Sequence, residues 1–117
     1  MKVFLTGATG YVGNQLALEL AINNYEVHAL VRDVQSVKIP KQERIKVFAG
    51  NVCDLSSIIK AMKGCDYVFH TAAHTNLKCR NIDNFYNVNV LGTENILKAA
   101  LELKIKKVIY TSTLSVY

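Results

Sequence analysis

The sequence predicts an α/β fold in which helices cover both faces of a parallel sheet. Short apolar segments with strand character alternate with segments of helical periodicity along all 117 residues, and no repeat or linker interrupts them. A glycine-rich turn separates the first apolar segment from the first helical one. Because crossovers between parallel strands are right-handed, we expect a doubly wound sheet of about five strands in the order 3-2-1-4-5.

The chain is organised around its first thirteen residues. The apolar run at 3–5 ends at Thr6, and three evenly spaced glycines follow, Gly7, Gly10 and Gly13. We expect Gly7 to permit a tight turn, Gly10 to let a pyrophosphate approach the backbone, and Gly13 to let the helix pack close to the strand. Free N–H groups and the dipole of the helix that follows make this turn a predicted anion site.

The remaining elements follow from periodicity and from residues that begin or end helices. Val12, Leu16 and Leu20 recur every four residues and predict the buried stripe of the first helix. Asp54 is the expected N-cap of the second helix, and Gly64 takes the left-handed position after it. Strands are expected at 3–5, 26–31, 44–49, 67–70 and 107–111, and helices at 11–23, 55–62 and 84–104.

The pattern at 84–104 is apolar on two faces. One face carries Ile96 and Ala99, and the other carries Leu97 and Leu101. A helix of this kind is either deeply buried or commits one face to a partner, so we expect a homodimer through 84–104 as one use of it.

Composition narrows the class of protein. Half of the residues are hydrophobic and 20% are charged, which suits one globular domain over 1–117. The net charge of +5 fits an anionic ligand or a solvated basic surface, and no nucleic-acid motif accompanies it. Three cysteines without CxxC spacing, no secretory signal and no long apolar run predict a cytoplasmic protein without a membrane partner.

Four short motifs resemble those of the extended short-chain dehydrogenase/reductase family and occur in that family's order. The chain reads TGATGYVG at 6–13, HTAA at 70–73, NVLGT at 89–93 and YTSTLSVY at 110–117. The resemblance runs from one end of the chain to the other. It implies a Rossmann-like, NAD(P)-binding domain that forms the cofactor-binding portion of an oxidoreductase or epimerase acting on a small molecule.

The resemblance also implies a role for residues at the carboxyl ends of the predicted strands. Asn51 stands where the family usually has Asp, and its amide can still hydrogen-bond an adenine edge. Thr113 is the implied catalytic hydroxyl, which bonds the reacting oxygen of the substrate. An ordinary cap or strand-end hydrogen bond is the alternative for each Thr and Asn. The implied cofactor-binding residues are Gly7, Thr9, Gly10, Tyr11, Val12, Gly13, Arg32, Asn51, Val52, Thr71, Ala72, Ala73, Asn89 and Thr111.

The end of the second strand bears on the choice of dinucleotide. Val31 stands where NAD-preferring members of the family carry a carboxylate, and Arg32 follows it. A guanidinium pairs with a 2′-phosphate, so we expect NADP. NAD stays the alternative, because Asp33 can turn toward the ribose, and Arg32 and Asp33 can also form a mere surface pair. The VRD ending resembles flavonol-reductase and hydroxysteroid-dehydrogenase-like branches, which implies carbonyl reduction or alcohol oxidation.

The family's general acid/base, a tyrosine followed four residues later by lysine, does not occur in this sequence. We therefore expect a fragment that stops before the later strands and the substrate domain and that is inactive alone. A nucleotide-sugar epimerase or dehydratase with tightly bound NAD and a non-catalytic NADP-sensing module are the alternatives. His70 and His74 straddle a strand end, so we expect no metal site.

Overall fold

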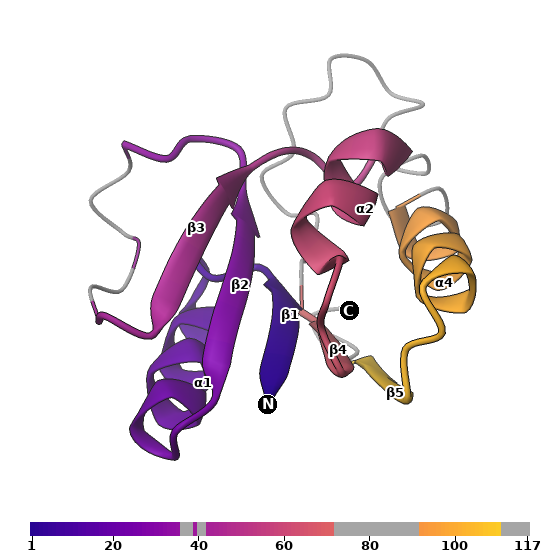
Figure 1. Ribbon diagram of the computed structural model, residues 1–117. Coiled ribbons are helices and arrows are strands. Elements are labelled where there is room, and N and C mark those ends of the chain that lie inside the picture. The colour runs from indigo at the N-terminus through magenta and orange to yellow at the C-terminus, as the bar shows by residue number, and fades with distance from the viewer. Residues whose placement is uncertain (36–38, 40–41, 72–91, 111–117) are drawn as a thin grey trace, which may run out of the picture.

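The computed structural model describes residues 1–35, 39, 42–71 and 92–110, which form a five-stranded parallel sheet with helices on both faces (Figure 1). The strand order is β3-β2-β1-β4-β5, which confirms the predicted topology. The strands are β1 (Lys2–Thr6), β2 (Glu26–Val31), β3 (Ile45–Ala49), β4 (Tyr67–His70) and β5 (Lys107–Tyr110), and the helices are α1 (Tyr11–Ile22), α2 (Leu55–Met62) and α4 (Gly92–Glu102).

The register of the strands aligns their carboxyl ends at one edge of the sheet. Thr6 is paired with Leu30 on one side and with His70 on the other, and His70 is paired in turn with Tyr110. In doubly wound sheets the ligand binds beyond this edge, so the polar groups that gather there are the ones to examine for function.

Helix α1 covers one face of the sheet, but the prediction of its buried stripe is wrong at Val12. The side chain of Val12 is 53% exposed, while Leu16 and Leu20 pack only at the margin of the core. The positions that face the sheet carry small residues, Gly13, Ala17 and Ala21. A Cβ on Gly13 would lie 1.9 Å from the carbonyl oxygen of Gly7, so the helix is too close to the sheet for larger side chains.

Helices α2 and α4 cover the other face with large apolar side chains. Ile58 and Met62 of α2 and Ile96 of α4 are buried above Phe4 of β1. Helix α2 begins as predicted, since the carboxylate of Asp54 accepts a hydrogen bond from a backbone N–H in its first turn. The chain leaves α2 through Gly64, whose φ of +86° confirms the predicted left-handed position.

The described part of the long helical pattern, α4, has one buried and one exposed apolar face. Ile96 and Ala99 are buried, whereas Leu97 is 46% and Leu101 is 80% exposed. Residues 84–91 lie outside the described residues, and pairing of two copies through this helix stays a prediction. None of the described helices has the length and apolar character needed to cross a membrane.

Candidate functional site

The glycine turn connects the carboxyl end of β1 to the start of α1. Gly7 has a φ of +81°, as the predicted tight turn requires, and the N–H of Gly10 donates to the carbonyl of Gly7 at 3.0 Å. Gly10 is the N-cap of α1 and has no side chain with which to cap the helix. Helix α1 therefore begins at the ligand edge without a side-chain cap, which is the usual arrangement where an anion occupies that position.

The second and third glycines of the turn, Gly10 and Gly13, differ in what surrounds them. A Cβ on Gly13 would meet Gly7 at 1.9 Å and the hydroxyl of Thr71 at 2.9 Å, which confirms that Gly13 is required for close packing. A Cβ on Gly10 would meet only the carbonyl oxygen of Gly7, at 3.4 Å, and the φ of Gly10 is −90°. Nothing among the described residues requires a glycine at position 10, so the bare backbone there leaves room for a ligand.

Thr6 and Thr71 tie β1 to β4 beneath the turn. The backbone N–H of Thr71 donates to Oγ1 of Thr6 at 3.0 Å, and the hydroxyl of Thr71 donates to the carbonyl oxygen of Thr6 at 2.6 Å. The hydroxyl of Thr71 thus forms a strand-end hydrogen bond, the alternative that the sequence left open for it. Any contact of Thr71 with a cofactor stays a prediction.

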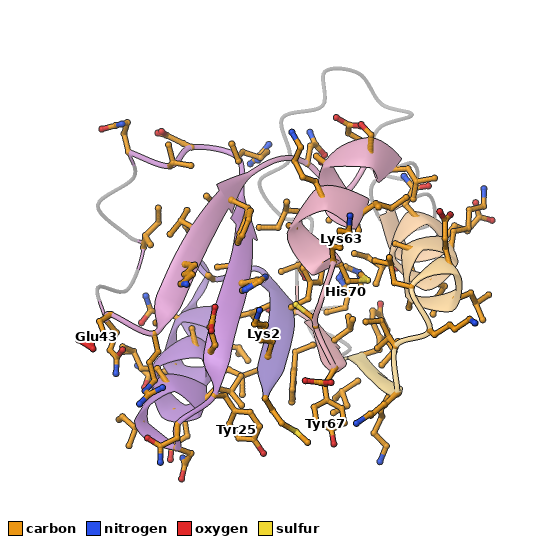
Figure 2. The ribbon with its side chains drawn as sticks, in the orientation of Figure 1. Lys2, Tyr25, Glu43, Lys63, Tyr67 and His70 are labelled. Carbon is orange, nitrogen blue, oxygen red and sulfur yellow. The ribbon has the colours of Figure 1, made fainter. Side chains whose placement is uncertain are left out.

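His70 is buried and connects β4 to β1 and α4, a role that was not predicted. The sequence placed His70 only in the HTAA motif and offered no support for it as a metal ligand. His70 is labelled in Figure 2. It is 3% exposed, with Nδ1 at 2.8 Å from Oγ1 of Thr6 and Nε2 at 3.3 Å from Oγ1 of Thr93. Its ring lies against that of Tyr110, with centroids 5.4 Å apart. Burial lowers the pKa of His70 to about 4, so the ring is neutral at pH 7. Its sequence signal is a polar residue that ends an apolar strand.

At the end of β2, the two charged neighbours Arg32 and Asp33 do not pair with each other. Arg32 and Asp33 are both exposed, while Val31 before them is buried. One carboxylate oxygen of Asp33 accepts the backbone N–H of Gln35 at 2.9 Å, so Asp33 caps a local turn. Within the described residues Arg32 forms no ion pair with Asp33 or any other carboxylate, which leaves its guanidinium available to an anion.

The turn after β3 is held by two residues that the sequence did not single out. Ser57 of α2 accepts the backbone N–H of Asn51 at 3.1 Å, and Asn95 of α4 donates to the carbonyl oxygen of Val52 at 3.0 Å. The side-chain oxygen of Asn51 accepts the N–H of Cys53 at 2.8 Å. Asn95 is 6% exposed, and its only sequence signal is a polar residue among the apolar positions of a helix.

Several predicted site residues lie outside the described residues, and their roles stay predictions. They are Ala72, Ala73, Asn89, Thr111 and Thr113, as is His74 of the histidine pair. The structure places Thr9 at the exposed side of the glycine turn. In the described ranges no three His, Cys, Asp or Glu side chains are arranged to hold a metal ion.

The sheet order, the glycine turn and the uncapped helix at the carboxyl edge define the class: a Rossmann-like, doubly wound α/β protein. The chain belongs to the NAD dependent epimerase/dehydratase family, whose sequence profile matches residues 3–117. This match confirms the resemblance to the short-chain dehydrogenases/reductases.

Similar proteins include both reductases and epimerases. The chain is 37% identical over 112 residues to a putative dihydroflavonol 4-reductase of Synechocystis, which covers 96% of this chain and 32% of the relative. It is 37% identical over 130 residues to a UDP-glucose 4-epimerase of Rickettsia bellii, and this match covers 95% of this chain and 36% of the relative. The solved structure of an epimerase of Methanothermobacter thermautotrophicus superposes with a TM-score of 0.82 at 31% sequence identity. The match covers 96% of this chain and 35% of that structure. The chain spans about a third of the length of these relatives.

Proposed function

We propose that this chain is the NADP(H)-binding portion of an oxidoreductase that reduces a carbonyl or oxidises an alcohol of a small molecule. The observation that carries the proposal is the uncapped start of α1 behind Gly10, a glycine that no described contact requires. The pyrophosphate of a dinucleotide supplies the missing cap, because the N–H groups of Tyr11 and Val12 and the helix dipole favour an anion there.

The choice of NADP rests on the end of β2. Arg32 is exposed and unpaired among the described residues. Position 31 is a valine and not a carboxylate, and the carboxylate of Asp33 accepts the backbone N–H of Gln35. A guanidinium binds a phosphate through two parallel, charge-assisted hydrogen bonds. The 2′-phosphate of NADP can form this pair with Arg32, whereas the 2′-hydroxyl of NAD cannot. NAD stays the alternative cofactor.

The remaining roles of the proposal fall to residues near the reacting end of the cofactor. Thr71, Ala72 and Ala73 line the nicotinamide-ribose side, and Asn89 braces the site. Thr113 bonds the reacting oxygen of the substrate while the bound nicotinamide gives or takes a hydride. Since the 117 residues contain no tyrosine followed four residues later by lysine, we propose that this chain alone binds the cofactor without turnover.

A nucleotide-sugar epimerase with tightly bound NAD is the second candidate. It is favoured by the similarity to the UDP-glucose 4-epimerase of Rickettsia bellii, which is as high as that to the reductase. The two candidates differ in the dinucleotide they require, so cofactor binding separates them.

The test is a titration of the chain with NADPH and with NADH, repeated for Arg32→Ala. We expect NADPH to bind more tightly than NADH, and the variant to lose about 1–3 kcal/mol of NADPH affinity, the scale of a charge-assisted hydrogen bond. NADH affinity is expected to stay unchanged. Arg44→Ala, which removes an exposed arginine from the turn before β3, is the matched control.

Equal affinity of the parent for the two dinucleotides, unaffected by Arg32→Ala, would favour the epimerase candidate. If neither NADPH nor NADH binds the chain, the cofactor-binding function itself is rejected.

A further inference from the structure

Five exposed lysines gather at the amino edge of the sheet, opposite the edge at which the dinucleotide is proposed to bind. Lys2 begins β1, Lys63 follows α2, and Lys107 begins β5. Lys104 and Lys106 lie in the connection between α4 and β5, which Figure 1 shows at the lower right. These five lysines form the basic patch, and none of them belongs to the proposed dinucleotide site.

Backbone hydrogen bonds bring the segments of the basic patch together. The N–H of Asp66 donates to the carbonyl oxygen of Lys2 at 2.8 Å, and the N–H of Lys106 donates to the carbonyl oxygen of Asp66 at 3.0 Å. Lys2, Asp66 and Lys106 therefore lie side by side at the amino ends of three neighbouring strands. The amine of Lys2 reaches toward the end of α2, since a Cβ on Gly64 would lie 3.9 Å from its Nζ. Lys63 directly precedes Gly64, so its charge adds to the same edge.

Few carboxylates oppose the charge of the basic patch. The segments that form the patch contain two, Asp66 and Glu102. The Oδ1 of Asp66 lies 3.9 Å from the Nζ of Lys106, and its Oδ2 accepts the backbone N–H of Lys2 at 3.1 Å. In the part of the chain that the structure describes, the other four lysines of the patch have no carboxylate within ion-pair distance. The basic patch is therefore net positive, and its one ion pair is long.

An exposed apolar side chain adjoins the basic patch. Leu101, in the last turn of α4, is 80% exposed, and Leu97 one turn earlier is 46% exposed. The N–H of Lys104 donates to the carbonyl oxygen of Leu101 at 3.2 Å, so this leucine lies at the margin of the lysines. Exposure of a leucine to water is unfavourable, and a surface that buries the side chain gains that free energy.

The composition of this surface favours a lipid partner over a protein or a nucleic acid. Residues 1–2, 63–66 and 97–107 contain no arginine and no aromatic residue. Protein interfaces are enriched in arginine and aromatic residues and depleted in lysine, and single-stranded nucleic acids are bound by aromatic stacking. Clustered lysines beside an apolar side chain are instead typical of surfaces that bind anionic lipid headgroups.

We propose that the basic patch docks this chain on an anionic membrane surface, with the lysines at the headgroups and Leu101 inserted between the lipids. The carboxyl edge of the sheet then faces the solvent, so a dinucleotide can reach the glycine turn. The prediction of no membrane partner rested on the lack of a long apolar run, which a patch assembled from three segments does not require. Docking of this kind needs no membrane-spanning helix, and none of the described helices is one.

The experiment measures co-sedimentation of the 117-residue chain with vesicles of phosphatidylcholine, either alone or mixed with phosphatidylserine. We expect binding to vesicles that contain about one third phosphatidylserine, no binding to phosphatidylcholine alone, and release by salt, because salt screens the attraction. The double variant Lys106→Gln, Lys107→Gln should bind about 25-fold more weakly, at about fivefold for each lysine. Leu101→Gln should weaken binding about tenfold, because it removes the inserted apolar side chain.

Arg44→Gln combined with Lys46→Gln is the matched control. Both residues are exposed near the start of β3, at the other end of the sheet from β5, and their substitution removes the same two charges. Vesicle binding of this control should equal that of the parent. Thermal melts of all variants report whether each one is folded.

Equal binding to both kinds of vesicle, no binding to either, or a loss below about threefold in the double lysine variant would overturn the proposal. Binding to polyglutamate without binding to the anionic vesicles would also overturn it and would assign the basic patch to an acidic protein. NADPH titration is independent of these outcomes, so the proposed function stands or fails separately.

Discussion

Helix α1 lies on one face of the sheet, and helices α2 and α4 lie on the other (Figure 1). The two faces are packed by these helices in different ways. Helix α1 lies on its face through small residues, including Gly13 and Ala17, so that its backbone contacts the glycine turn. Helices α2 and α4 lie on the other face through large side chains such as Ile58 and Ile96. The close approach of α1 places its first N–H groups at the end of β1, whereas the thicker layer opposite mainly buries apolar surface.

The difference implies that the two faces fail differently when they are altered. On the α2 and α4 face, loss of volume is expected to reduce stability without moving the site. On the α1 face, a gain of one carbon atom at Gly13 is expected to displace the glycine turn itself. Substitutions on each face measure this directly.

Ile58→Ala is expected to have the largest effect on stability, because Ile58 is fully buried. Removal of a buried isoleucine side chain costs about 2–5 kcal/mol of unfolding free energy, depending on how far the cavity collapses. Urea unfolding gives this value, and dinucleotide affinity of the folded variant should match the parent. A clear loss of affinity would show that the two faces are not separable.

Gly13→Ala is expected to destabilise the chain by about 3 kcal/mol, the upper range for overpacking, because the new Cβ would lie 1.9 Å from a backbone oxygen. It should also abolish dinucleotide binding, since α1 must move. The matched variant Gly10→Ala places a Cβ 3.4 Å from the carbonyl oxygen of Gly7, an ordinary contact distance, and is expected to lose less than about 1 kcal/mol of stability. Similar unfolding free energies for both variants would contradict the packing difference between the two glycines.

The third prediction concerns His70, which joins β1, β4 and α4 on the face of the large side chains. Its pKa is lowered to about 4 by burial, against an ordinary value of 6.5. Between these values the unfolded chain binds a proton that the folded chain does not, so the free energy of unfolding falls as the pH falls from 6.5 to 4. The free energy of unfolding falls by at most about 3 kcal/mol over this range, and it does not depend on His70 above pH 6.5.

Urea unfolding at several pH values tests this expectation in the parent and in His70→Asn, which is expected to remove that part of the pH dependence. Thr93→Val is the control, because it breaks one hydrogen bond of His70 and leaves the titrating ring in place. It should lower stability at every pH with the slope retained. An unchanged slope in His70→Asn would assign the acid sensitivity to other groups.

Much of the fold was predictable from local patterns. The apolar run from Glu26 to Val31 is β2 as predicted, and the Asp54 cap and the left-handed Gly64 bound α2. These features are local, because strand alternation, capping and a positive φ depend on residues only a few positions apart. The roles of Gly7 and Gly13 were predictable for the same reason, since they belong to one continuous turn.

The sequence by itself thus determined the order of elements and the position of the glycine turn at the ligand edge. Only the tertiary structure decided which residues of α1 face the sheet, since the distance between helix and strand selects Ala17 over Val12. It also decided the links from His70 to Thr6 and from Asn95 to Val52, which join positions 64 and 43 residues apart. Such contacts depend on strand register and helix packing, which bring together residues that no local pattern relates.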